Sequence, residues 1–370
     1  MPNLTIIVPT FNRSHLLKTC LKFIRKQDPS IQVVVTDSSN EKERAINRET
    51  VREMGSHIDY LEFDISVRPL EKLHAAVNLA STEYTCLCAD DDLIVLKSAL
   101  ECTEFLSENK DYVACHGYYL RYSLTDSRSI LFEDWEYRGP SLTGDSPSKR
   151  VIDLLSNYEA LFYSVQATPM LRMSLEAMST SPYSMHQELA NAIWLAMAGK
   201  VKRIDGLYNL RQAGNSALHP LAEPHSYIAE RFACVMSDYA SMAGQLTARF
   251  KSAYPGNEEA DLFQTLCFGF MVYLYRSIDF IALARLMIPN YPEGALGALP
   301  LIRPPTFRQS IRLVLKEFME RVVRYLKRKA LAARPPIVVH SNATGHSIFI
   351  SRVLNHGLAS RYREELRQLF

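Results

Sequence analysis

Apolar runs and amphipathic stretches alternate through the first hundred residues. Four short runs have the composition of buried strands, at residues 4–8, 31–35, 58–63 and 84–89. Helical stretches follow the first three runs and begin at Ser14, Glu41 and Pro69. Because repeated strand–helix units connect parallel strands, this pattern predicts an α/β fold, a Rossmann-like and mostly parallel sheet with helices on both faces.

The second half of the chain has a different pattern. Further strands are predicted at 113–119 and 200–207, and helices at 149–162 and 184–198. After residue 220 the apolar positions follow a helical period over 225–250, 258–287 and 306–333. We therefore expect two parts, an α/β domain over residues 1–220 and a helical C-terminal region over residues 221–370.

The composition is that of a globular protein. Of the 370 residues, 47% are hydrophobic and 22% are charged, without a low-complexity tract. The seven cysteines include no CxxC pair, which argues against a zinc knuckle or a disulfide framework. The first residues lead straight into a strand rather than a signal peptide. The longest apolar stretch, 262–275, is shorter than the ~20 residues that span a bilayer, so we expect a buried helix and a cytoplasmic protein.

Three consecutive aspartates, Asp90, Asp91 and Asp92, follow the strand at 84–89. Neighbouring carboxylates repel one another, so a fold keeps them together where a divalent cation neutralises them or where they face water. An Asp-x-Asp sequence after a buried strand suits Mg²⁺ or Mn²⁺ bound with a diphosphate, because hard cations take carboxylate and phosphate oxygens together. A solvated acidic turn is the alternative interpretation.

Polar segments end two other predicted strands, at residues 9–13 and 37–40. In open α/β sheets, ligands bind beyond the carboxyl ends of the strands. We therefore expect these two segments and the aspartates to line one crevice.

Glu188 is the candidate general base. Ser184 and Gln187 have the spacing of a capping box, which places Glu188 in the first turn of a helix. The helix dipole favours the ionised carboxylate there. The alternative is an acid that only complements the dipole.

Basic residues provide further candidates. Arg211 opens a polar segment whose donors can hold phosphates. His219, later in that segment, is a candidate metal ligand, with a solvated loop histidine as the alternative. Lys72 lies opposite the apolar stripe of its helix and points toward the crevice or toward solvent.

Together these segments resemble the GT-A fold glycosyltransferases, specifically family 2 and a bacterial subgroup with a triple-Asp motif. The resemblance is specific in Thr5-Ile-Ile-Val-Pro-Thr-Phe-Asn-Arg13 and in Ala89-Asp-Asp-Asp92. Glu71-Lys72-Leu73 matches the lysine that precedes the triplet in this subgroup. The resemblance covers roughly residues 4–219.

The resemblance implies a role for each matching residue. Asp92, Asp90 and His219 would bind the metal, Mn²⁺ or Mg²⁺, that bridges the leaving diphosphate. Glu188 would deprotonate the acceptor hydroxyl, with inversion at the sugar. Asp37 would contact the base, and Asp90 would also contact the ribose. The residues implied to hold the nucleotide sugar are Pro9, Thr10, Asn12, Arg13, Asp37, Lys72, Asp90, Asp91 and Arg211.

Two positions depart from the family pattern, one directly after the base and one at His219, which falls slightly later than the histidine common in the family. The family usually has a second acid after the base, where this chain has Leu189. Asp205 and His186 are therefore alternative candidates for the general base.

The C-terminal region has no counterpart in the resemblance. Residues 303–334 contain ten Lys or Arg and two Glu, a local charge of +8 in a chain of net charge +2. Apolar positions recur at helical spacing over 306–333, which predicts a basic amphipathic helix. Such a helix can lie on the inner face of a membrane with anionic lipid, or pack on its own domain or a second subunit of a homo-oligomer.

The first functional hypothesis is a metal-dependent glycosyltransferase of polysaccharide biosynthesis. It would move a sugar from a nucleotide-sugar donor, with UDP favoured, to a hydroxyl of a bacterial glycan, a lipid-linked glycan or a protein. A nucleotidyltransferase is one alternative, although its Gly-rich first loop is missing. A non-catalytic carbohydrate-binding or scaffold protein of the same fold is another. Nucleic-acid binding is not expected, because no groove-reading motif is present.

Overall fold

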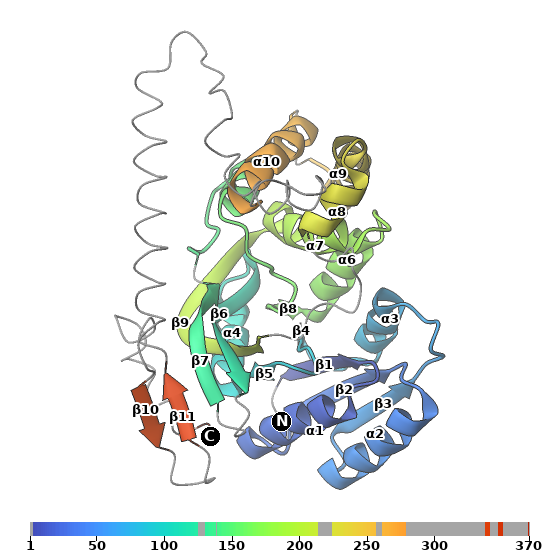
Figure 1. Ribbon diagram of the computed structural model, residues 1–370. Helices are drawn as coiled ribbons and strands as arrows, with labels where there is room; N and C mark the ends of the chain where they lie inside the picture. The colour runs from blue at the N-terminus through green and yellow to red at the C-terminus, as the bar shows by residue number, and fades with distance from the viewer. Residues whose placement is uncertain are drawn as a thin grey trace, which may run out of the picture. The chain divides into compact units, whose positions relative to one another are not determined.

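The computed structural model describes residues 3–124, 130–137, 139–213, 224–256, 261–278, 337–340, 347–350 and 369 (Figure 1). The chain divides into two compact units. The first comprises Met1–Leu120 and Glu136–Leu283, and the second comprises Arg121–Trp135 and Ala284–Phe370. His219 and the predicted basic helix at 306–333 lie outside the described residues.

A mixed sheet forms the centre of the first unit. Its parallel part has the order β4-β1-β2-β3 and consists of β4 (Tyr84–Leu87), β1 (Leu4–Thr10), β2 (Gln32–Asp37) and β3 (Ile58–Glu62). The short strand β8 (Val165–Ala167) continues the sheet antiparallel to β4 and to β6 (Tyr112–Leu124). The long strand β9 (Lys200–Gln212) pairs with β6 and with β5 (Leu93–Ile94). The predicted α/β class is confirmed, and the parallel strands are the four predicted first.

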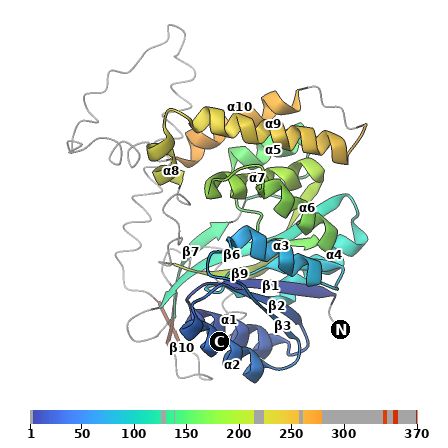
Figure 2. The ribbon, with the colours of Figure 1, turned by 90° about the vertical axis from the view of Figure 1, so that its right-hand side faces the viewer.

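The alternation of side chains along β1 explains why helices cover both faces of the sheet. Leu4, Ile6 and Val8 pack in one buried cluster with side chains of α1 (Ser14–Gln27) and α4 (Leu96–Glu108). Ile7 points to the opposite face and packs with side chains of α3 (Pro69–Leu79) and α6 (Thr168–Met178). Figure 2 shows α1 and α2 (Glu41–Met54) on one side of the parallel strands and α3 on the other.

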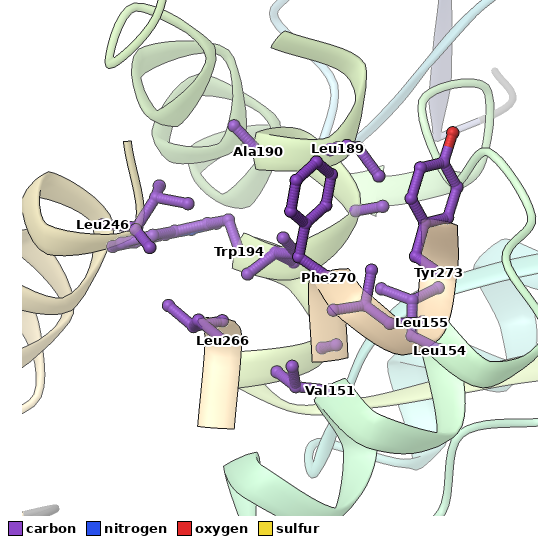
Figure 3. Close-up of a cluster of buried hydrophobic side chains, with 14 of the residues drawn as sticks. Val151, Leu154, Leu155, Leu189, Ala190, Trp194, Leu246, Leu266, Phe270 and Tyr273 are labelled. Atoms are coloured by element: carbon purple, nitrogen blue, oxygen red, sulfur yellow. The ribbon is translucent and has the colours of Figure 1, made fainter. Parts of the chain in front are cut away.

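A second core lies among helices of the first unit. It joins α5 (Pro147–Ser156), α7 (Ser184–Ala198), α8 (Pro224–Arg231), α9 (Val235–Ala253) and α10 (Leu262–Ser277). Figure 3 shows Trp194 and Leu189 of α7 packed with Leu246 of α9 and Phe270 of α10. In the described part of the chain, no helix is both long and apolar enough to cross a bilayer.

The helices predicted after residue 220 are therefore present as far as α10. Helix α10 buries one face, including Leu266 and Phe270, but its other face exposes Phe263, Phe268, Met271 and Tyr275, so the prediction of a buried helix at 262–275 is correct for one face only. These helices belong to the first compact unit, which continues through Leu283. The division at residue 220 stays a prediction.

Three short strands are described in the second unit. Strand β10 (Ile337–His340) pairs antiparallel with β11 (Ser347–Ile350), and β11 pairs parallel with β7 (Ile130–Tyr137) at residues 130–132. The sequence pattern did not indicate these strands; β10 and β11 span only four residues each, which is too short to show a clear period.

Candidate active site

The carboxyl ends of β1 and β4 meet, as predicted from the parallel order of the strands. Thr10, the last residue of β1, donates a hydrogen bond of 2.7 Å from its hydroxyl to Asp90 Oδ2. Both side chains are almost fully buried. The first loop and the acidic triplet therefore share one site, although they lie 80 residues apart in the sequence.

Arg13 neutralises part of the acidic triplet. One terminal nitrogen of its guanidinium lies 2.5 Å from Asp90 Oδ1, and the other donates to Asp91 Oδ2 at 2.9 Å. Burial raises the pKa of Asp90 to about 6, although the charge of Arg13 and the Thr10 hydroxyl act in the opposite direction. An arginine thus provides a third way to hold adjacent carboxylates, besides the cation and the open water considered from the sequence.

Asp92 lies beside the end of β9. Its Oδ1 accepts a hydrogen bond of 3.3 Å from the backbone N–H of Gln212, because β5 and β9 pair antiparallel with Leu93 opposite Leu210. This pairing also brings Arg211 to the acidic triplet. The first two residues of the basic segment, Arg211 and Gln212, thus lie beside the aspartates.

The chemistry of the triplet fits a hard cation. Carboxylate oxygens are the ligands that Mg²⁺ and Mn²⁺ prefer. Among the described residues there is no group of three or more His, Cys, Asp or Glu side chains arranged to hold a metal ion. A cation at Asp92 would therefore complete its shell with oxygens of a bound ligand or with water.

Lys72 points into the protein rather than toward solvent. Its ammonium donates to the backbone carbonyl of Thr10 at 3.0 Å and to Ser38 Oγ at 2.9 Å, and only 2% of the residue is exposed. Burial lowers the pKa of Lys72 to about 8, against the opposing charges of Asp37 and Asp90. A cation therefore lies between the ends of β1 and β2.

Asp37 ends β2 and is fully buried. Its carboxylate accepts hydrogen bonds from the Ser39 backbone at 2.7 Å, from Asn47 Nδ2 at 2.7 Å and from the Tyr60 hydroxyl at 2.5 Å. Burial alone would raise the pKa of Asp37, but the hydrogen bonds from Ser39, Tyr60 and Asn47 outweigh it and lower the pKa below its usual value. The carboxylate is thus held ionised and in one orientation.

Asn12 joins the loops that follow β1 and β2. Its Oδ1 accepts hydrogen bonds of 2.8 Å from both the backbone and the side chain of Asn40, and its own N–H donates to Ser39 Oγ at 2.7 Å. Its φ of 54° lies in the left-handed region, which asparagine tolerates better than most residues. Pro9, opposite Thr36 in the β1–β2 pair, precedes this loop.

Tyr163 lies near several charged residues of this site and was not predicted from the sequence. The guanidinium of Arg211 lies 5.8 Å from the centre of the Tyr163 ring. Burial raises the pKa of the Tyr163 phenol, Arg211 opposes this, and the carboxylates of Asp92 and Glu188 raise it further. The charges of Arg211, Asp92 and Glu188 therefore act on one ring. A single tyrosine in a loop carries no spacing that would have identified it.

The start of α7 differs from the predicted capping box. Ser184 is the first helical residue, and Tyr183 occupies the N-cap position without a side-chain hydrogen bond. The amide of Gln187 donates instead to the backbone carbonyl of Ser181 at 2.9 Å. Glu188 is partly exposed and is the fifth residue of the helix, so it lies beyond the first turn in which it was predicted and where the helix dipole acts most strongly.

The two alternative candidates for the general base lie in unlike environments. His186 is fully buried among the aromatic rings of Tyr183, Tyr227 and Phe270, and burial lowers its pKa to about 4. Asp205 is exposed on β9. Because His186 is buried away from water, it is disfavoured as the general base that contacts a substrate.

Known proteins resemble the N-terminal part of this chain. Residues 5–176 match the model of glycosyl transferase family 2. A GalNAc(5)-diNAcBac-PP-undecaprenol beta-1,3-glucosyltransferase of Campylobacter jejuni is 28% identical over 167 residues, which is 45% of this chain and 52% of the relative. The chain therefore spans about half the length of that relative.

Two solved structures have a similar arrangement at low sequence identity. TarS of S. aureus is 14% identical with a TM-score of 0.43, and the match covers 74% of this chain and 91% of TarS. The mannosyltransferase PcManGT of Pyrobaculum calidifontis, solved with GDP-Man and Mn²⁺, is 16% identical with a TM-score of 0.41. That match covers 80% of this chain and 79% of PcManGT.

The matched segment runs from β1 into α6 and contains the first loop, Asp37, Lys72 and the acidic triplet. It thus includes the parallel strands and the loops at their carboxyl ends, and the predicted α/β class holds for this segment. Residues 5–176 of this chain are therefore similar to glycosyl transferase family 2.

Proposed function

We propose that this protein is a glycosyltransferase that takes its sugar from a nucleotide-sugar donor. The observation that carries the proposal is the convergence of Thr10, Arg13 and Lys72 with the acidic triplet at one edge of the sheet. The family match covers the same residues. A crevice with both cations and carboxylates suits a diphosphate, because the cations attract its charge and the carboxylates can share a metal with it.

The donor would lie along the ends of β1, β2 and β4. Asp37 would contact the base, Asp90 the ribose, and Lys72, Arg13 and Arg211 the diphosphate. The loop residues Pro9, Asn12 and Asp91 would complete this pocket. We favour UDP as the nucleotide.

A divalent cation, Mn²⁺ or Mg²⁺, would be held by Asp92, with Asp90 and His219 as further candidate ligands. When bound, such a cation neutralises charge on the leaving diphosphate. PcManGT, a protein of similar arrangement, was solved with Mn²⁺. For the present chain the metal and its identity are part of the proposal.

Glu188 would remove the proton from the acceptor hydroxyl, and transfer would invert the configuration at the sugar. Its carboxylate and that of Asp92 both raise the pKa of the Tyr163 phenol, which supports a base close to the proposed metal ligand. Among acceptors on a glycan, a lipid-linked glycan or a protein, we favour the lipid-linked glycan, because the relative from C. jejuni is named for an undecaprenol-linked substrate. Membrane or subunit contact through residues 306–333 is a further part of this proposal.

Calorimetric titration tests the proposal. UDP, GDP, CDP and dTDP are each added with and without Mn²⁺ to the wild type, to Asp92→Ala and to Asp59→Ala, a control at an exposed aspartate of β3. We expect one nucleotide to bind with Mn²⁺ to the wild type and to Asp59→Ala, and weakly to Asp92→Ala. Absence of binding by every nucleotide in both conditions would favour the scaffold alternative.

A further inference from the structure

Arg13 is held in front of the acidic triplet by both its backbone and its side chain. Its carbonyl accepts hydrogen bonds from the backbone N–H groups of Leu16 and Leu17 at 3.0 and 3.1 Å, which fixes the start of α1. Its guanidinium spans two carboxylates, with 2.5 Å to Asp90 and 2.9 Å to Asp91. A planar guanidinium that divides its donors between two acids gives a charge-assisted contact to each.

This contact covers the two carboxylates from solvent. The side chain of Asp90 is 0% exposed and that of Asp91 is 12% exposed, whereas that of Arg13 is 24% exposed. The guanidinium is therefore the outer group of the cluster. A divalent cation that approached these two aspartates would meet a positive charge already in place, and like charges repel strongly where little water lies between them.

We propose that Arg13 is an internal counter-ion that keeps the acidic triplet from binding a divalent cation until a diphosphate is present. A diphosphate offers the guanidinium a second anionic partner with the geometry that arginine prefers. Asp90, the candidate ligand beside Asp92, then becomes available to the cation, and the carboxylate of Asp91 no longer pairs with Arg13. Cation and nucleotide therefore bind together rather than one by one. The nucleotide half of this inference rests on the proposed function, whereas the half that concerns the cation alone rests only on the contacts of Arg13.

A titration with MnCl₂ in the absence of nucleotide tests the part of the inference that concerns the cation alone. Free Mn²⁺ is followed by electron paramagnetic resonance with the wild type, Arg13→Gln and Arg48→Gln. Arg48 is a matched control, because its guanidinium also donates two hydrogen bonds to carboxylate oxygens, each of 2.6 Å to Glu62, but on the exposed surface of α2. We expect Arg13→Gln to bind Mn²⁺ at least about tenfold more tightly than the wild type, and Arg48→Gln to bind like the wild type.

A double variant locates the gained site. Arg13→Gln combined with Asp91→Asn is expected to lose most of the gain, because one of the released carboxylates is gone. Equal Mn²⁺ affinity of the wild type and a folded Arg13→Gln protein overturns the inference. If circular dichroism shows that Arg13→Gln is unfolded, Arg13→Lys takes its place, since an ammonium cannot hold both acids as a planar fork does. For a folded Arg13→Lys protein, a gain of about threefold supports the inference, and no gain overturns it.

The same titration with UDP separates this inference from the proposed function. We expect UDP to raise the Mn²⁺ affinity of the wild type by more than it raises that of Arg13→Gln. If UDP does not bind at all, the proposed donor is wrong, and the comparison without nucleotide still decides the role of Arg13. An equal effect of UDP on both proteins overturns the coupling.

Discussion

The ammonium of Lys72 on α3 donates a hydrogen bond of 3.0 Å to the backbone carbonyl oxygen of Thr10 at the end of β1. A second hydrogen bond, of 2.9 Å, reaches Ser38 after β2. The lysine therefore connects the ends of the two neighbouring strands β1 and β2. Its burial makes the protonated form costly, and this cost has a measurable consequence.

We expect Lys72 to make the free energy of unfolding depend on pH. Burial lowers its pKa to about 8 in the folded protein, from an ordinary value of 10.5. Between these values the unfolded chain binds more protons than the folded one, so stability rises with pH, by up to about 3 kcal/mol. Below pH 8 the buried ammonium is protonated, and its burial lowers the free energy of unfolding by the full amount. Urea denaturation between about pH 7 and pH 10 measures the slope.

The variant Lys72→Met should lose this part of the slope. The control is Lys18→Met, which removes an exposed lysine that pairs with Glu53 on the surface. Identical pH profiles of the wild type and Lys72→Met would contradict the assignment.

Replacing the proposed base should separate catalysis from donor binding. Glu188→Gln keeps the size of the side chain but removes the group that accepts the proton, so transfer should slow by about 10²- to 10⁴-fold. UDP affinity, measured by calorimetry, should stay within about twofold, because the proposed role of Glu188 is toward the acceptor and not toward the donor. Glu176→Gln, which breaks a surface pair with Arg249, is the control. Full turnover by Glu188→Gln would rule out Glu188 as the base.

The ring of Tyr163 should matter more than its hydroxyl. Arg211 lies over the ring, and a cation–π contact contributes roughly 0.5 to 2 kcal/mol. Tyr163→Leu should therefore raise the donor KM by about 3- to 30-fold, whereas Tyr163→Phe should leave it near the wild-type value. Steady-state kinetics with varied donor distinguishes them. Equal loss in both variants would instead point to the hydroxyl.

Arg150 should be important for stability rather than chemistry. It is buried on α5 and donates hydrogen bonds to the carbonyl oxygens of Ala196 at 2.7 Å and Met197 at 2.8 Å. These carbonyls belong to the last turn of α7, where the helix itself supplies no donor for them. Arg150→Met should lower the free energy of unfolding by roughly 3 kcal/mol, because these buried acceptors lose their donors. Urea unfolding measures this.

The exposed Arg52, paired only with Glu49 on the surface, provides the comparison for Arg150. Arg52→Met should change the stability by less than about 0.5 kcal/mol. A similar small effect of Arg150→Met would show that α7 does not need this cap.

Helix α4 shows why some elements were not predicted from the sequence. It spans Leu96–Glu108, and no residue before it caps it with a side chain. The N–H of Leu96 donates instead to the side-chain oxygen of Gln27, at the end of α1 and 69 residues away. A start signal that comes from another helix cannot be seen in the local sequence. The short strand β8 is similar, because it exists only through its antiparallel neighbours β4 and β6.

The sequence by itself determined the strands β1 to β4, the helices between them and the meeting of Thr10 with Asp90 at one edge. These follow from hydrophobic period and from the rule that parallel strands end together, and both are local or topological properties. Only the tertiary structure decided that Lys72 points inward, that Arg13 holds Asp90 and Asp91, and that Tyr163 lies beside Arg211. Such contacts join residues far apart in the chain, and side-chain burial and charge select among several partners that the sequence leaves equally open.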